Sequence, residues 1–354
     1  MISSILEIRH TNKKTVIKVN NENKKLTVNV LVTTAVNEAA LKRIETVSSR
    51  VKVTDVSKLA QAEQKGDAAA RKQLDELLAD AAIIYGFRLP ADVLTRAPKL
   101  KWFQTMSAGV DRFLTEEFKR SQVVMTSVSG IHAVPIGEFV LGLMLMLAKQ
   151  TPLAFQQKQQ KLWKSYLATE LRGKIVGIVG LGNIGREVAR LAQAFGMKVV
   201  AMRRSAGRSR RTRYVDKLYL RDQLQALLAE SDFVVLTLPL TAETERIIGE
   251  AELRAMKPTA YIINIARGNL VDEEALIKAL QEHRIAGAGL DVFSKEPLPA
   301  DSPLWEMPNV IMSPHIAGGM ADYIDRATDI FIQNLRRYLK GESLLNIVNK
   351  EIGY

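Results

Sequence analysis

The chain has 354 residues, a formal net charge of +12, 47% hydrophobic and 25% charged residues, and no cysteine. This length is more than one hydrophobic core usually serves, so we expect two domains. The lack of cysteine excludes disulfides, thiolate metal sites and thiol nucleophiles, and it agrees with a cytoplasmic location. The basic runs carry no nucleic-acid motif, and the longest apolar run, residues 139–148, is shorter than the about 20 residues that a membrane span needs. We therefore expect no nucleic-acid, membrane or metal partner, and the charge suits an anionic substrate or cofactor.

The first 25 residues have a strand-like pattern. Short apolar stretches at Ile5–Ile8 and Thr15–Val19 are separated and followed by the polar runs TNKK and NNENKK, which suit hairpin turns. We expect an N-terminal β-rich extension at residues 1–25, followed by a strand at Leu26–Val32 that belongs to the first domain. A partly disordered basic arm is the alternative.

Between Val28 and Ser127 the chain alternates short apolar stretches, such as Ala81–Tyr85 and Leu100–Thr105, with helical ones. Such alternation predicts a parallel sheet with helices on both faces. The long apolar stretch Ile136–Lys149 predicts a helix that joins this first domain to the next part of the chain.

The segment KIVGIVGLGNIGREVAR, residues 174–190, is the most informative in the chain. An apolar strand leads into Gly180, Gly182 and Gly185 at GxGxxG spacing, and a helical pattern follows. In such a turn the first glycine permits the bend, the second lets a pyrophosphate approach, and the third lets the helix pack closely on the strand. The N–H groups at the start of the helix favour phosphates. Together with a second strand at Lys198–Met202, the segment predicts a dinucleotide site.

The residue after that second strand discriminates between the two nicotinamide cofactors. About 20 residues beyond the glycines, this position carries Asp or Glu where the ribose hydroxyls of NAD are bound. Here it is Arg203, followed by Arg204 and Ser205. These side chains suit the 2′-phosphate of NADP through charge-assisted hydrogen bonds. We expect NADP(H) to be favoured over NAD(H), with a merely basic surface loop as the alternative.

Later strands deliver polar residues to the same edge of the predicted sheet. We expect these strands at residues 232–239, 261–265, 286–290 and 310–312, and a helix capped by Asp272 after the second of them. Arg267 follows the second of them, Glu296 the third and His315 the fourth. Because ligands of open α/β sheets bind at the carboxyl ends of the strands, these three are candidate site residues.

The three side chains form a complete set for reducing a 2-oxo acid. Arg267 offers a planar, permanently charged fork for a carboxylate. A histidine such as His315 ionises near neutral pH and can protonate a developing alkoxide, and Glu296 would orient the ring if it is bonded to it. Each residue also has a plainer interpretation: a salt-bridging arginine, a solvated loop acid and a buried, packed histidine.

Several motifs together resemble one family. GLGNIG, NIARGNLVDEEAL, GLDVFSKEPLP, NVIMSPHIAG and NIVNKEIGY occur in the order and spacing typical of the D-isomer-specific 2-hydroxyacid dehydrogenases, over about residues 26–354. The resemblance implies an oxidoreductase that transfers a hydride between a nicotinamide cofactor and a small 2-oxo or D-2-hydroxy acid. It assigns substrate binding to Arg267, acid/base catalysis to His315, and support of that histidine to Glu296.

The resemblance also implies ligand contacts by other residues. Main-chain N–H groups of Ala108 and Gly109, in the segment MSAGVD, would bind the substrate carboxylate, and Asp291 would lie near the nicotinamide carboxamide. The residues expected around the cofactor are Gly180, Gly182, Asn183, Ile184, Gly185, Arg203, Arg204, Ser205, Thr237, Leu238, Pro239, Ile265, Ala266, Asp291 and Ala317.

The implied architecture is α/β, with two Rossmann-like or flavodoxin-like domains and parallel sheets. Residues 26–127 and 318–354 would form the substrate domain and residues 128–317 an inserted dinucleotide-binding domain, and the two would close around the ligand. Family members are commonly homodimers, with a long helix such as Ile136–Lys149 at the interface. Arg203 resembles the pattern of NADPH-dependent glyoxylate/hydroxypyruvate reductases, whereas the N-terminal extension matches nothing in the family.

Two other functions stay open. One is a nucleotide-sensing interaction protein of the C-terminal-binding corepressor type, which shares the fold and the Arg, Glu and His, but for which an acid is expected in place of Arg203. The other is a dehydrogenase of the same fold with a different substrate, such as phosphoglycerate or formate.

Overall fold

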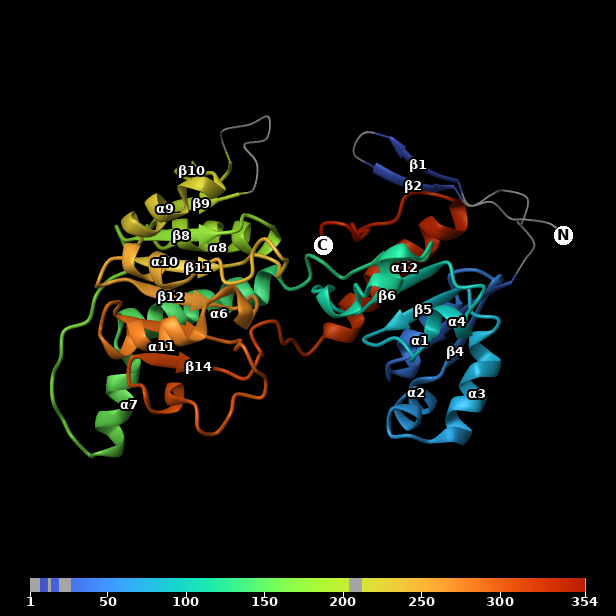
Figure 1. Ribbon diagram of the computed structural model, residues 1–354, viewed down its shortest axis with the longest axis horizontal. Coiled ribbons are helices and arrows are strands. Elements are labelled where there is room, and N and C mark those ends of the chain that lie inside the picture. Colours follow the sequence, from blue (N-terminus) through green and yellow to red (C-terminus); the bar gives the residue numbers. More distant parts are fainter. Residues whose placement is uncertain (1–6, 12–13, 19–26, 204–211, 354) are drawn as a thin grey trace. The chain divides into compact units, whose positions relative to one another are not determined.

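The computed structural model describes residues 7–11, 14–18, 27–203 and 212–353. The chain divides into two compact units: unit 1 comprises Met1–Ile131 and Ala321–Tyr354, and unit 2 comprises His132–Met320. Each unit has a parallel sheet with helices on both faces (Figure 1). The predicted α/β class, with two Rossmann-like or flavodoxin-like domains, is therefore confirmed.

Unit 1 is built around five parallel strands in the order β4-β3-β5-β6-β7. The strands are β3 (Val28–Val32), β4 (Val51–Asp55), β5 (Ile83–Gly86), β6 (Trp102–Thr105) and β7 (Val124–Thr126). The helices are α1 (Glu38–Glu45), α2 (Ser57–Gln64), α3 (Ala68–Leu78), α4 (Val93–Arg96), α5 (Glu116–Arg120) and α12 (Tyr323–Lys340), with a 3-10 turn at Asp111–Phe113. The predicted strands are present with slightly different ends, whereas β4 and β7 are additional.

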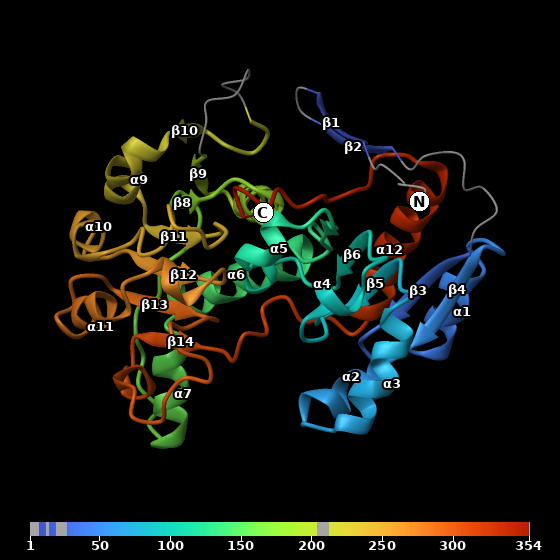
Figure 2. The same cartoon turned by 45° about the vertical axis from the view of Figure 1, so that its right-hand side comes forward.

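Alternating side chains of the strands feed two hydrophobic clusters, one on each face of the unit 1 sheet. Along β3, Val30 and Val32 join α1 and α12 on one face, whereas Leu31 joins α2, α3, α4 and α5 on the other. The stacked rings of Tyr85 and Phe331, with centroids 4.2 Å apart, join β5 to α12. A helix from late in the chain therefore covers strands from its beginning, and Figure 2 shows it in red beside them.

Buried polar side chains also join α12 to this sheet. Trp102 Nε1 donates to Thr126 Oγ1 at 2.7 Å, and Thr126 Oγ1 donates to Gln104 Oε1 at 2.7 Å. Asn334 Nδ2 donates to the same Gln104 oxygen at 2.9 Å, and Asn334 Oδ1 accepts from Leu345 N at 2.6 Å. Because leaving a buried polar group without its partner costs about 1–3 kcal/mol, these bonds specify the position of α12 on the sheet.

The first two strands form a hairpin of their own. β1 (Glu7–Thr11) and β2 (Lys14–Lys18) pair antiparallel, with Glu7 opposite Lys18. The strand expected at Leu26–Val32 is β3, which pairs in parallel with β4 and β5 in the sheet of unit 1.

Unit 2 has seven parallel strands in the order β10-β9-β8-β11-β12-β13-β14. They are β8 (Ile175–Val179), β9 (Lys198–Met202), β10 (Lys217–Tyr219), β11 (Phe233–Leu236), β12 (Tyr261–Asn264), β13 (Gly287–Leu290) and β14 (Val310–Met312). The helices are α6 (Ala133–Ala148), α7 (Thr151–Gln159), α8 (Asn183–Ala194), α9 (Leu224–Glu230), α10 (Glu250–Ala255) and α11 (Glu273–Gln281), with 3-10 turns at Arg221–Gln223, Gly268–Leu270 and Pro303–Glu306.

The helices of unit 2 also divide between the two faces of the sheet. Val176 and Ile178 of β8 pack with α6 and α8, whereas Val179 packs with α9, α10 and α11. At the start of α11, the side chain of Asp272 accepts a hydrogen bond from Ala275 N at 3.2 Å, which confirms the predicted helix cap.

The predicted long apolar helix is α6, and eight of its residues are buried in unit 2. In the described ranges, no single helix is long and apolar enough to cross a membrane. The pair α6 and α7, bent by 63° at their junction, passes that test together by length and composition. The core contacts of α6 with α8 and the sheet account for its apolar composition.

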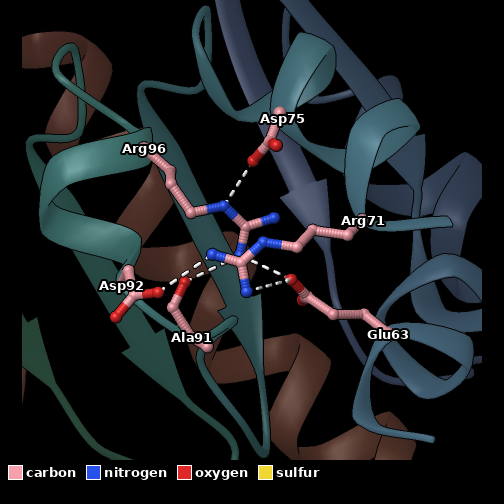
Figure 3. A network of polar contacts seen from close by, with 6 residues as sticks. All are labelled: Glu63, Arg71, Asp75, Ala91, Asp92 and Arg96. Carbon is pink, nitrogen blue, oxygen red and sulfur yellow. Dashed lines mark hydrogen bonds and ion pairs between the residues drawn. The ribbon is translucent and has the colours of Figure 1, made fainter. Parts of the chain in front are cut away.

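A cluster of charged side chains joins α2, α3 and α4 of unit 1 (Figure 3). Arg96 lies between the carboxylates of Glu63 and Asp75: its Nη1 is 2.7 Å from Glu63 Oε1, and its Nε contacts Asp75 Oδ1. Arg96 Nη1 also donates to the carbonyl oxygen of Ala91 at 2.7 Å. The side chains of Arg96 and Glu63 are each only 8% exposed, so the charges depend on each other.

We expect Arg96→Met to lower the free energy of unfolding by about 3 kcal/mol, because it removes the nearer cation, at 2.7 Å, from the buried Glu63 carboxylate and leaves only Arg71 at 3.7 Å. Adding Glu63→Leu should recover most of the loss, since both charges are then removed. The control is Arg71→Met, at an arginine that pairs with Asp92 and lies 3.7 Å from Glu63 but is 45% exposed, which should cost much less. Urea unfolding followed by circular dichroism measures these changes, and equal losses for the two arginine variants would contradict the argument from burial.

Candidate active site

The turn between β8 and α8 has the geometry of a phosphate-binding turn. Gly180 has a φ of 111°, a conformation that other residues rarely adopt. A Cβ on Gly185 would lie 2.3 Å from the carbonyl oxygen of Gly180, so glycine is required for this close packing. A Cβ on Gly182 would meet no atom within 4 Å, which leaves space beside the first residues of α8, Asn183 and Ile184. The turn therefore fits the pyrophosphate of a dinucleotide.

This turn lies where the strand order of the sheet reverses. β8 has β9 on one side and β11 on the other, which is where open α/β sheets bind ligands. Thr237, directly after β11, donates its hydroxyl to the Gly180 carbonyl, and its N–H donates to Val179 O at 3.0 Å. The structure thus brings Thr237, which Leu238 and Pro239 follow in the chain, to the glycine turn.

Arg203 directly follows β9, the strand beside the glycine turn. Its N–H donates to the carbonyl oxygen of Tyr219 in β10 at 3.2 Å, and the residue is half-buried. The strand end nearest the turn is therefore cationic. Arg204 and Ser205, the other two residues expected at a 2′-phosphate, lie outside the described residues.

Arg267 lies in a short turn directly after β12. Its Nη1 donates to the carbonyl oxygen of Ala266 at 2.7 Å. Asn264, the last residue of β12, is buried and bonds to the main chain of this turn. Sequence reasoning missed Asn264, although a polar residue at the end of the apolar strand YIIN was a usable signal.

His315 and Glu296 meet beyond β14 and β13. His315 Nδ1 is 2.8 Å from Glu296 Oε2, and Glu296 Oε1 accepts from Phe293 N at 3.1 Å. Both side chains are half-exposed, and His315 has a φ of 55°. The contact through Nδ1 leaves Nε2 on the other side of the ring for proton exchange with a ligand.

Asp291 directly follows β13 and is only 1% exposed. Its Oδ1 accepts from Ser313 Oγ at 2.6 Å and from Ile316 N at 2.8 Å, and its Oδ2 accepts from Ala317 N at 2.8 Å. The N–H of His315 donates to the carbonyl oxygen of Asp291 at 2.9 Å. Asp291 therefore shapes the loop that holds the histidine, a role that its place in the sequence did not reveal.

In unit 1, the segment MSAGVD follows β6 at the carboxyl edge of the sheet. Among the described residues, neither the N–H of Ala108 nor that of Gly109 donates to another residue. The carbonyl of Met106 accepts from the hydroxyl of Tyr323. Burial raises the pKa of Tyr323 to about 12, so this hydroxyl keeps its proton. Because the N–H groups of Ala108 and Gly109 bond to no other described residue, they can donate to an anion.

The candidate residues of unit 2 follow strands of one sheet and therefore lie along one edge of it. No group of three or more His, Asp or Glu side chains that could hold a metal ion is found in the part of the chain that the structure describes. Across the sheet, the residues after β9, β8, β11, β12, β13 and β14 are Arg203, Gly180, Thr237, Arg267, Asp291 and His315. This edge can bind anionic groups and exchange a proton.

Comparison with known proteins identifies the family. Residues 141–317 match the model of the D-isomer specific 2-hydroxyacid dehydrogenase, NAD binding domain. The chain is 36% identical over 280 residues to glyoxylate reductase of Korarchaeum cryptofilum, a match that covers 75% of this chain and 80% of that protein. It is 32% identical over 334 residues to D-3-phosphoglycerate dehydrogenase of Methanocaldococcus jannaschii, covering 91% of this chain but 59% of that protein.

A solved structure extends the likeness to nearly the whole chain. The crystal structure of NADPH-dependent glyoxylate/hydroxypyruvate reductase from Sinorhizobium meliloti, in complex with NADP and sulfate, matches with a TM-score of 0.78 and 26% identity. The match covers 93% of this chain and 100% of that one. Unit 2 contains the matched NAD(P)-binding domain, with the glycine turn and the strand-end residues inside it. The chain therefore belongs to the D-isomer specific 2-hydroxyacid dehydrogenases, a family of oxidoreductases.

Proposed function

We propose that this protein is an NADP(H)-dependent reductase of small 2-oxo acids such as glyoxylate or hydroxypyruvate. The observation that carries the proposal is the 2.8 Å contact between His315 Nδ1 and Glu296 Oε2, on the sheet edge that also bears the glycine turn. The pair is an oriented proton donor, and Arg267 adds a cation two strands away. Reduction of a 2-oxo acid requires both.

The roles of the residues follow from this chemistry. A bound nicotinamide cofactor supplies the hydride. Arg267 binds the substrate carboxylate and polarises the 2-oxo group. In unit 1, the N–H groups of Ala108 and Gly109 are donors for a carboxylate. His315, oriented by Glu296, gives its Nε2 proton to the carbonyl oxygen as carbon 2 accepts the hydride. The product is a 2-hydroxy acid, and oxidation is the reverse.

Arg203 supports NADP(H) as the preferred cofactor. It stands where NAD-binding chains carry an acid, and its guanidinium suits the 2′-phosphate, as would Arg204 and Ser205. The solved Sinorhizobium reductase is described as NADPH-dependent, which also favours this choice. The residues proposed to surround the rest of the cofactor are Gly180, Gly182, Asn183, Ile184, Gly185, Thr237, Leu238, Pro239, Ile265, Ala266, Asp291 and Ala317.

A substrate with more negative charge, such as a phosphoglycerate, is the second candidate. The likeness to D-3-phosphoglycerate dehydrogenase favours it, because that match covers 91% of this chain. Glyoxylate reductase is the more similar relative at 36% identity, and the match covers 80% of its length. We therefore place glyoxylate and hydroxypyruvate first.

We expect the protein to oxidise NADPH with glyoxylate or hydroxypyruvate, and to use NADH less well. Arg203→Gln should raise the KM for NADPH about tenfold and leave the KM for NADH nearly unchanged, because only NADPH carries the 2′-phosphate. Loss of reduced-nicotinamide absorbance measures both. Turnover with 3-phosphohydroxypyruvate alone would favour the second candidate, and tight NADPH binding without turnover of any 2-oxo acid would favour a nucleotide-sensing protein.

His315→Ala should lower kcat about 10²- to 10⁴-fold and leave NADPH affinity unchanged, because general acid catalysis contributes this much. Glu296→Gln should have a smaller effect, since it keeps the shape of the side chain and removes only its charge. His283→Ala, at an exposed histidine after α11, is the control and should be neutral. Steady-state rates and NADPH fluorescence titrations make the comparison, and full turnover without the His315 imidazole would remove it as the acid.

We also propose that the partner is a second copy of this chain. The helix expected at the interface, α6, uses most of its apolar side chains within unit 2. Apart from Val134 on α6, exposed apolar side chains lie on α7 and just after it, at Phe155, Leu162, Trp163 and Leu167, and Trp163 is 101% exposed. Exposed apolar patches mark interfaces, and closed homodimers are the commonest soluble oligomers.

Hydrogen bonds hold the segment after α7 in place, but its apolar side chains are exposed. Residues 162–170 have no regular secondary structure, and Figure 1 draws them as a green trace that continues from α7 within unit 2. Thr169 N donates to Ala148 O at 2.9 Å, and Gln150 Nε2 donates to Leu167 O at 2.9 Å. These bonds fix the end of the segment while Trp163 and Leu167 stay exposed. A second copy would bury them.

Sedimentation velocity should show a dimer, and Trp163→Ser combined with Leu167→Ser should weaken it at least about tenfold, because buried aromatic anchors dominate interface energies. Phe195→Ser, at an exposed apolar residue that ends α8 in the same unit, should leave the dimer intact. A wild-type protein that stays monomeric at micromolar concentration would rule out this interface.

A further inference from the structure

Asn264 is a buried polar residue at the carboxyl end of β12. It is 1% exposed, and the rest of the strand, Tyr261, Ile262 and Ile263, is apolar or aromatic. It pairs with Leu236 of β11 on one side and Leu290 of β13 on the other. A buried amide costs free energy unless its donors and acceptors find partners. Its partners therefore indicate its role.

Both ends of the Asn264 amide bind the turn that carries Arg267. Oδ1 accepts from Ala266 N at 3.1 Å, and Nδ2 donates to the carbonyl oxygen of Arg267 at 2.9 Å. The main-chain carbonyl of Asn264 accepts from Asp291 N at 2.9 Å, which keeps the residue in the sheet. The amide therefore fixes the main chain of Arg267 relative to the end of the strand.

A second contact fixes the other side of this turn. A Cβ on Gly268 would lie 1.9 Å from the carbonyl carbon of Phe293 and 2.4 Å from Ser294 N, so the turn packs directly on the main chain of the loop that leads to Glu296. Arg267 is in extended conformation, with φ −147° and ψ 140°, and its Nη1 donates to Ala266 O at 2.7 Å. The main-chain position from which the Arg267 side chain extends thus depends on the turn that Asn264 closes.

We infer that Asn264 is a positioning residue for Arg267: its side-chain amide sets the direction from which the guanidinium meets the carboxylate of a 2-oxo acid. The inference rests on the proposed function, which gives Arg267 that ligand. A bidentate arginine–carboxylate pair is sensitive to direction, because the planar fork must face the carboxylate edge. Loss of the amide therefore weakens carboxylate binding through Arg267 alone, because Asn264 is assigned no contact with the substrate or with the glycine turn.

The experiment is a double-mutant cycle between Asn264 and Arg267. Asn264→Ala is made in the wild-type chain and in Arg267→Ala, and the KM for glyoxylate or hydroxypyruvate and the dissociation constant of oxalate in the presence of NADP⁺ are measured. Asn264→Ser, which keeps an acceptor for Ala266 N, is the milder variant if alanine impairs folding. Asn309→Ala is the matched control, because its amide also bonds main-chain carbonyls, of Leu280 and Ala286, but at the opposite edge of the sheet.

We expect Asn264→Ala to raise the KM and the oxalate dissociation constant about 10- to 100-fold, since misplacement of a binding group by about 1 Å has effects of this size. NADPH affinity should stay within about twofold, and Asn309→Ala should leave both substrate constants unchanged. In the Arg267→Ala background, Asn264→Ala should add no further loss.

The outcomes distinguish the ligand assigned to Arg267 from the positioning role assigned to Asn264. If Arg267→Ala itself leaves the KM and the oxalate constant unchanged, the ligand assigned to Arg267 in the proposed function is wrong. If Arg267→Ala weakens binding but Asn264→Ala adds the same factor in both backgrounds, or none in either, the proposed function stands and the positioning role of Asn264 is overturned.

Discussion

Hydrogen bonds to buried polar groups at strand ends are the constraint on which the candidate site depends. The carboxylate of Asp291 is 1% exposed and receives three hydrogen bonds from residues 313–317, so the loop with His315 takes the path that satisfies it. One strand away, Asn264 imposes the same requirement on the turn with Arg267. Each residue can affect the site without contact to a ligand, because it sets the main-chain position from which a charged or titratable side chain extends.

Close main-chain packing supplies the rest of the precision. Gly185 lets α8 approach Gly180, and Gly268 lets the Arg267 turn touch the main chain at Phe293. In both places a Cβ atom would lie 2.3 Å or less from a main-chain atom, so no larger residue fits without moving the main chain. The parallel strands then bring these turns to one edge of the sheet, the carboxyl edge at which open α/β sheets bind their ligands.

The sequence predicted the parts of the fold and site that rest on local patterns. Apolar strands, the glycine spacing and strand-end logic were enough to single out Arg267, Glu296 and His315, and the Asp272 cap is a contact over three residues. β4, with the sequence VKVTD, was missed because three of its five side chains are polar, and only pairing with β3 reveals it. The loop-shaping role of Asp291 was also missed, since its partners lie 22 to 26 residues later. Asn264 was within reach, because its bonds span only two and three residues.

The division of unit 1 between two distant parts of the chain affects how the protein is made. The face of its sheet that carries Tyr85 and Trp102 is covered by α12, which the ribosome produces only after all of unit 2. At about 5–20 residues per second, the 189 residues of His132–Met320 take roughly 10 to 40 seconds to synthesise. During that time the nascent chain presents an open apolar surface, because α12 has not yet been made. Chaperones that bind such surfaces therefore have a defined interval in which to act, and chains interrupted before Tyr323 remain their clients.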